Sequence, residues 1–271
     1  MIKDLRQQYN QQFDQANYDR MMDWITELHG YRPTFSVAET PVFLDSPILE
    51  RLQAASNDII EVLTQPGFTQ QAEKALLPGQ QVPNRTDHPL FLQMDFGLCR
   101  DEDGSITPQL IEAQGFPSLY FFQDILAQAY HKFMGIPETY TPFFSGLTHE
   151  TYRQLLADCV LGGEAPEHVI LLEIEPKKQN TRIDFIAARN LIGIYEVCIS
   201  ELILEGKKLF YLRDGVKTQV KRIFSRVIFD ELTQRDDLKR AFNMVEEVDV
   251  SWAGHPDWFF MISKHTLPAF D

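Results

Sequence analysis

The stretch from residue 168 to residue 204 decides the fold class, and it reads as three segments: "HVILLEIEP" (168–176), "NTRIDFIAARNLIG" (180–193) and "IYEVCISELIL" (194–204). The first and third segments are nearly continuous apolar runs, which are typical of strands buried on both faces. The second has apolar residues at helical spacing and closes on a glycine. Because such a unit makes a parallel strand pair with a right-handed crossover, the sequence predicts an α/β fold with a partly parallel sheet flanked by helices.

The segments on either side extend this pattern. Upstream, "SLYFFQDILAQAYHKF" (118–133) predicts a helix capped by Ser118, and "THETYRQLLADCVLGG" (148–163) predicts a helix that ends at its glycines. Downstream, "KKLFYLRDGVKTQVKRIFSRVIF" (207–229) predicts a hairpin about an Asp-Gly turn, and "DELTQRDDLKRAFNMV" (230–245) predicts another helix.

The first 30 residues are polar and rich in glutamine. The apolar positions of residues 5–21 predict one amphipathic helix, and "SPILERLQAASNDIIEVLTQ" (46–65) predicts a second helix with Ser46 as its N-cap. A loop rich in Pro, Gly and Gln follows, "LLPGQQVPNRTDHP" (76–89). We therefore expect an N-terminal helical segment, 1–78, packed on an α/β substrate-binding unit, 79–271.

Composition limits the kinds of partner. The 271 residues include 39 acidic and 25 basic side chains, and the resulting net charge of −14 opposes binding to nucleic acid or anionic membranes. No apolar run approaches the roughly 20 residues that span a bilayer, and the start, "MIKDLRQQYNQQFDQ", has no signal-like segment. We expect a cytoplasmic protein without nucleic-acid or membrane partners, and leave a homodimer open.

A second predicted hairpin carries the first candidate site residues. The tetrad "DEDG" (101–104) separates two strand-like runs, and pairing Arg100 with Ser105 would make Asp95 and Glu112 diagonal neighbours on one face, roughly 7 Å apart. Gln114 follows at a Gly-Phe-Pro corner, where glycine would let a ligand approach the backbone closely. Two carboxylates at that distance can hold an amine or a cation. The alternatives are a solvated sheet face and, for Gln114, a backbone-capping amide.

Two arginines complete the candidate set. Arg226 emerges from an apolar strand, and its planar guanidinium suits a carboxylate or phosphate, although an ordinary ion pair would explain it as well. Arg182 begins the predicted crossover helix, where the helix N-terminus can help to hold an anion; a surface arginine is the alternative.

Several kinds of site are not supported by the sequence. The three cysteines are far apart, and the seven histidines show no metal-ligand spacing. There is no "GxSxG" nucleophile motif and no glycine-rich phosphate loop. We therefore assign neither catalytic nor metal-ligating residues.

The order of "MDFGL" (94–98), "LIEAQGFPSL" (110–119), the strand–helix–strand unit, "VKRIFSRVIFDEL" (220–232) and "HPDWFFMISKHTLPAF" (255–270) resembles a known family. It is similar to the N-terminal, pre-ATP-grasp part of glutathionylspermidine-synthase-like and circularly permuted ATP-grasp proteins. The resemblance implies a pre-ATP-grasp-like sheet, an anion-binding role for Arg226, and a place for Lys264 beside the ATP-binding half. On its own, Lys264 would be a surface lysine.

The resemblance also implies a function. It identifies the chain as the substrate-binding portion of an ATP-dependent carboxylate–amine ligase, inactive alone, with ATP and Mg²⁺ expected only if an ATP-grasp domain follows residue 271. Gln114 stands where the family has asparagine, and the following Asp-Thr is missing, which puts glutathione as the substrate in doubt. The acidic pair and Arg226 together favour an amino-acid-like or peptide-like ligand. The alternative is a stand-alone binding or scaffold protein without catalysis.

Overall fold

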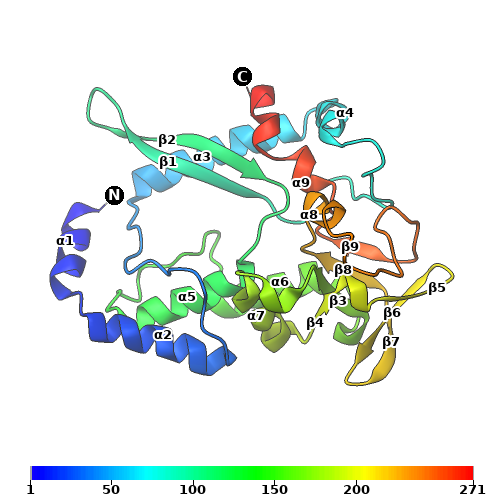
Figure 1. The fold of residues 1–271 in the computed structure, drawn as a ribbon. Coiled ribbons are helices and arrows are strands. Elements are labelled where there is room, and N and C mark those ends of the chain that lie inside the picture. Colours follow the sequence, from blue (N-terminus) through cyan, green and yellow to red (C-terminus); the bar gives the residue numbers. More distant parts are fainter. Residues whose placement is uncertain (1, 271) are drawn as a thin grey trace.

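The computed structural model describes residues 2–270. A four-stranded parallel sheet in the order β4-β3-β8-β9 lies in the right-hand part of Figure 1. Every residue of β3 is buried, as the apolar run predicts. The predicted α/β class, with a partly parallel sheet and flanking helices, is confirmed. The sheet is formed by β3 (Val169–Glu173), β4 (Tyr195–Cys198), β8 (Arg222–Ser225) and β9 (Ser251–Ala253).

Helices cover one face of this sheet. The crossover helix α7 (Arg182–Ile192) follows β3 and ends at Gly193, whose φ of 77° is the left-handed conformation that glycine adopts without strain. It packs against α5 (Tyr120–Phe133) and α2 (Gln15–His29), and α5 also contacts α6 (His149–Leu161). One apolar core joins these helices to the sheet through residues such as Ile25, Phe121, Leu171 and Phe185.

A small antiparallel sheet packs near the other face. It consists of β5 (Ile203–Glu205), β6 (Lys208–Arg213) and β7 (Val216–Val220), and the predicted turn at Asp214–Gly215 is confirmed. The single strand expected over 194–204 is wrong. Its chain leaves the parallel sheet at Cys198, where the Glu201 carboxylate accepts the Cys198 backbone N–H at 3.0 Å and fixes a 3-10 turn.

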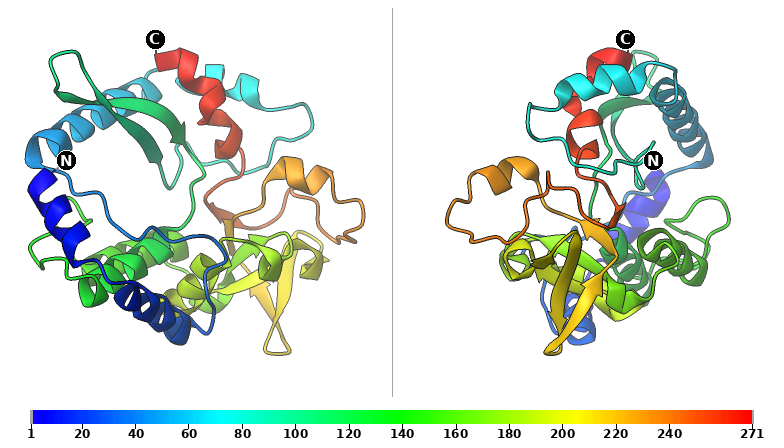
Figure 2. Two further views of the ribbon diagram at one scale, coloured as in Figure 1. Left: turned by 60° about the vertical axis from the view of Figure 1, so that its left-hand side comes forward. Right: turned by 90° about the vertical axis from the view of Figure 1, so that its right-hand side faces the viewer.

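The hairpin β1 (Gln93–Arg100) and β2 (Ile106–Gln114) belongs to a third, separate group of elements. It lies with α3 (Ser46–Leu63), α4 (Phe68–Ala72) and α9 (Trp258–Met261) in the upper part of Figure 1, and Figure 2 shows the same grouping from two other sides. A 3-10 helix over Lys264–Phe270 completes this part. The shared core contains Ile59, Phe68, Ala113, Trp258 and Ile262. The C-terminal residues therefore lie against the hairpin.

Expectations about the helices near both ends of the chain are also wrong. The N-terminal helix is two helices, α1 (Lys3–Gln12) and α2, because Asp14 caps the second by accepting the Ala16 N–H at 3.0 Å. Asp45, and not Ser46, caps α3.

Of the helix expected over 230–245, only α8 (Phe229–Thr233) forms. Beyond it, Phe242 and Met244 are buried on either side of exposed Asn243, whose carbonyl accepts the Glu246 N–H at 2.8 Å in a turn.

No helix within residues 2–270 is long and apolar enough to cross a membrane. The boundary between units 1–78 and 79–271 stays a prediction, and Asp271 lies outside the described residues.

Candidate functional site

The two hairpin carboxylates face each other directly. Asp95 pairs with Glu112, and Gln93 pairs with Gln114, so all four side chains share one face. The expected diagonal arrangement is wrong, because the first pair after the turn is Arg100 with Ile106, and a bulge beside Asp95 inserts Ile111 as an extra residue. The bulge brings the acidic groups closer together than the predicted register would.

Amide groups bind both carboxylates. The Gln114 Nε2 donates to Asp95 Oδ2 at 3.1 Å and to Glu112 Oε1 at 2.7 Å, while the Gln93 Nε2 donates to Asp95 Oδ1 at 3.0 Å. Gln114 thus bonds to side chains and does not cap the backbone. Lys264 Nζ lies 3.0 Å from Glu112 Oε2, although the Lys264 side chain remains 66% exposed. The cluster therefore carries a net charge of about −1 and includes one easily displaced ammonium group.

This cluster opens on a pocket of about 320 Å³. Glu112 and Gln114 contribute its polar wall, and Phe116 forms part of its apolar wall. The remaining lining residues all come from the C-terminal segment: Phe259, Phe260, Ile262, Ser263, Lys264 and His265.

Gly115 has a structural reason to be glycine. A Cβ there would lie 2.8 Å from the Trp258 carbonyl oxygen and 3.0 Å from Ile262 Cβ, and the Gly115 N–H already donates to the Ile262 carbonyl at 3.0 Å. The close approach expected at this glycine is thus made by the chain's own α9 segment and not by a ligand.

Arg226 reaches the same corner from the carboxyl end of β8. Its Nη1 donates to the Pro117 carbonyl at 2.6 Å and to the Phe116 carbonyl at 3.4 Å, and its guanidinium carbon lies 4.7 Å from the centre of the Phe116 ring. Burial lowers the pKa of Arg226, although the neighbouring Glu173 and Asp184 oppose this shift. Its Nε and Nη2 have no hydrogen-bond partner among residues 2–270, and Arg226 is not among the residues that line the pocket.

Asp184 fixes the start of α5. Its Oδ1 accepts the Phe122 backbone N–H at 2.8 Å, which satisfies a donor that the helix leaves free. Ser118 is therefore not the cap, and Leu119 stands at the helix start with a φ of 69°. Burial raises the pKa of Asp184 to about 6. The backbone hydrogen bonds to its carboxylate and the nearby Arg226 lower the pKa, but they offset the effect of burial only in part.

Glu173 is the second buried acid at this edge of the sheet. Only 6% of the residue is exposed, and burial raises its pKa to about 8, while the Ile174 N–H bond and Arg226 lower it. Tyr120 lies between the sheet edge and the hairpin. Burial raises its pKa, Asp184 and Asp95 add to this rise, and Arg226 opposes it. Asp184, Glu173 and Tyr120 were not predicted as site residues. A signal for the two acids exists in the sequence, because they interrupt the apolar runs "RIDFIAA" and "VILLEIE".

Arg182 and Lys264 have different surroundings. The Arg182 guanidinium lies 3.3 Å from Glu196 Oε1 and 5.1 Å from the Tyr31 ring centre, and none of its contacts is with the hairpin corner. Lys264 lies at the corner itself, beside Glu112. Within residues 2–270, no three His, Cys, Asp or Glu side chains form a group able to hold a metal ion.

Comparison with known proteins identifies a similar fold and no relative by sequence. No family model and no curated protein matches the chain. A glutathione synthetase-like effector from Globodera pallida, solved in the apoform, resembles it with a TM-score of 0.54 and 12% sequence identity. The similarity covers 91% of this chain but only 62% of the other. At this identity, the likeness shows a common fold with a glutathione synthetase-like protein.

Proposed function

We propose that this chain is the substrate-binding portion of an ATP-dependent carboxylate–amine ligase of the ATP-grasp superfamily, and that it holds an amino-acid-like or peptide-like ligand at the hairpin corner. One observation carries the proposal: Glu112, on the acidic face of the hairpin, lines the pocket, while Arg226 bonds to the backbone of the same corner. The fold likeness to a glutathione synthetase-like protein supports the assignment to this superfamily.

The two ends of such a ligand would meet opposite charges. An ammonium group would replace Lys264 beside Glu112, since an exposed ion pair of this kind contributes only about 0–1 kcal/mol. A carboxylate would take the Nε and Nη2 donors of Arg226, whose fork geometry suits two parallel hydrogen bonds. Phe116 lies between these two positions, because it lines the pocket and stacks on Arg226. ATP and Mg²⁺ receive no site on this chain in the proposal.

A thermal-shift screen of amino acids, short peptides and polyamines tests the proposal. At ten times its Kd, a ligand stabilises the fold by about 1.4 kcal/mol, or roughly 2–3 °C for a chain of this size. We expect Glu112→Gln to remove the shift caused by amine-bearing compounds. The control Glu102→Gln removes an exposed carboxylate in the turn of the same hairpin and should retain the shift.

Arg226→Lys tests the carboxylate end separately. It should weaken an amino acid more than the corresponding amine that lacks the carboxylate, because lysine cannot reproduce the bidentate fork. If no amine-bearing compound stabilises the wild type, or if Glu112→Gln leaves such a shift unchanged, the pocket assignment is wrong and the corner is only a turn.

A further inference from the structure

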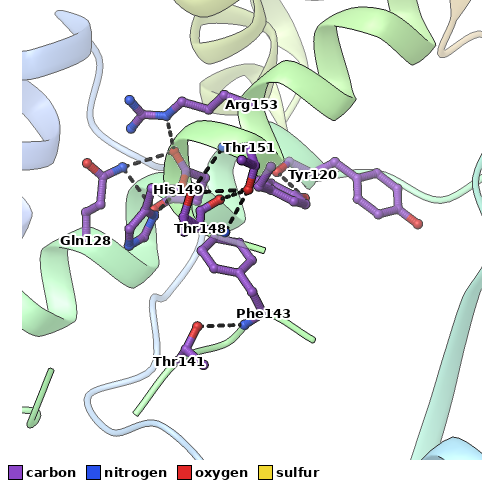
Figure 3. A network of polar contacts seen from close by, with 10 residues as sticks. Tyr120, Gln128, Thr141, Phe143, Thr148, His149, Thr151 and Arg153 are labelled. Carbon is purple, nitrogen blue, oxygen red and sulfur yellow. Dashed lines mark hydrogen bonds and ion pairs between the residues drawn. The ribbon is translucent and has the colours of Figure 1, made fainter. Parts of the chain in front are cut away.

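A second polar cluster lies on α5 and α6, outside the hairpin corner. Its centre is Asp124, which is fully buried. Asp124 Oδ2 accepts from Arg153 Nε at 2.7 Å and from Gln128 Nε2 at 3.0 Å, and Asp124 Oδ1 lies 2.5 Å from His149 Nδ1. Figure 3 shows Gln128, His149 and Arg153 converging from the two helices. The partners in the His149 bond are 25 residues apart, which is why histidine spacing did not indicate it.

This arrangement assigns the proton of the His149 ring. Asp124 pairs with the Arg153 guanidinium, and an ionised carboxylate can only accept hydrogen bonds, so His149 Nδ1 is assigned as the donor to Asp124 Oδ1. The other ring nitrogen, Nε2, has no hydrogen-bond partner among residues 2–270, and the His149 side chain is 37% exposed. A buried carboxylate therefore orients an imidazole whose second nitrogen remains free to bind a ligand.

His149 lies on the wall of a pocket of about 570 Å³, within the range of small-molecule sites. Lys132 lines the same pocket; its Nζ lies 4.8 Å from the Trp24 ring centre and forms no ion pair with any residue of 2–270. Glu138 is the one carboxylate among the described lining residues. The aromatic side chains of the wall are Trp24, Tyr140 and Phe143.

We propose that this pocket binds a phosphate ester of a small, ring-bearing molecule. A phosphate monoester carries up to two negative charges and three acceptor oxygens, so it can contact His149 Nε2 and Lys132 at the same time, whereas a carboxylate brings a single charge and two oxygens. Lys132 neutralises the remaining phosphate charge, and the aromatic wall stacks against the ring. This site is independent of the hairpin corner and does not rest on the proposed ligase function.

Calorimetric titration of the full chain with phenyl phosphate, inorganic phosphate and benzoate tests the proposal. Phenyl phosphate should bind more tightly than either of the others. His149→Ala should weaken phenyl phosphate binding by about tenfold or more, the effect of one charge-assisted hydrogen bond. Lys132→Gln should weaken it as well, whereas Glu138→Gln should strengthen it by removing a like charge. Glu112→Gln, at the hairpin corner, should leave it unchanged.

A spectroscopic measurement separates ligand binding from a purely structural role of the Asp124–His149 pair. In long-range ¹H–¹⁵N spectra of the imidazoles, His149 should show a protonated Nδ1 in the free protein, and phenyl phosphate should move the Nε2 resonance toward its protonated position. The proposal is overturned if benzoate or inorganic phosphate binds as tightly as phenyl phosphate, or if His149→Ala and Lys132→Gln bind it like the wild type. The proposal is also overturned if the wild type shows no binding at about 10 mM phenyl phosphate.

Discussion

Glu173 should make the protein less stable as the pH rises through neutrality. Its pKa is 4.5 in an ordinary environment and about 8 when buried in the fold. The unfolded chain therefore loses this proton first, and the free energy of unfolding falls between these two pKa values. Between about pH 6.5 and about pH 8, the free energy of unfolding falls by at most about 1.36 kcal/mol per pH unit. The fall is smaller near pH 8, because folded Glu173 is half ionised there, so the total loss is about 1.7 kcal/mol.

Urea denaturation of the wild type and Glu173→Gln at the two pH values measures this loss. Glutamine retains an oxygen to accept the Ile174 N–H, which Glu173 Oε1 accepts at 2.7 Å, but it cannot ionise. The decrease in unfolding free energy should therefore be smaller in the variant by about 1.7 kcal/mol.

Other shifted groups leave this comparison intact. Asp184 and Asp257, with pKa values of about 6, and His255, with a pKa of about 4, titrate in both proteins. Glu138→Gln, an exposed acid, serves as the control. Equal pH dependence in the wild type and Glu173→Gln would refute the assignment of a buried, neutral acid at the end of β3.

Two further predictions concern the frame of the site. Asp184→Ala should destabilise the fold by about 1–2 kcal/mol relative to Asp184→Asn in urea denaturation, because the amide oxygen can still accept the Phe122 N–H; equal stabilities would contradict the capping role. Gly115→Ala should cost about 1–3 kcal/mol, because its Cβ would meet the Trp258 carbonyl, whereas Gly97→Ala has only ordinary contacts at 3.8–3.9 Å and should change stability by less than about 1 kcal/mol. Thermal melting that places the two alanine variants together would contradict this reasoning.

Local patterns predicted the elements of the fold better than their connections. The run over 168–176 and the helix ending at Gly193 were predictable because burial of β3 and the left-handed cap depend on nearby residues. The hairpin was predictable too, but its register was not. The turn spans 101–105, one residue more than expected, and the bulge at Ile111 moves Glu112 again.

The site depends on contacts between distant parts of the chain, and these left little trace in the sequence. The Asp184 bond to Phe122 spans 62 residues, and the Arg226 bond to Pro117 spans 109. Residue type did select side chains that the structure brings together at the corner, since Asp95, Glu112 and Gln114 form one hydrogen-bonded cluster. Residue type alone did not show that Arg182 instead lies beside Glu196.

The two halves of the proposed site therefore rest on different supports. Asp184 fixes the start of α5, and Arg226 binds the carbonyls just before it, so the carboxylate-binding half is tied to the rigid parallel sheet. The amine-binding half depends on the hairpin bulge and on a Lys264 that is mostly exposed. Changes at the exposed Lys264 should therefore alter recognition of the amine while leaving Arg226 in place. In the proposed site, selectivity for the amine can thus change without disturbing the fold around Arg226.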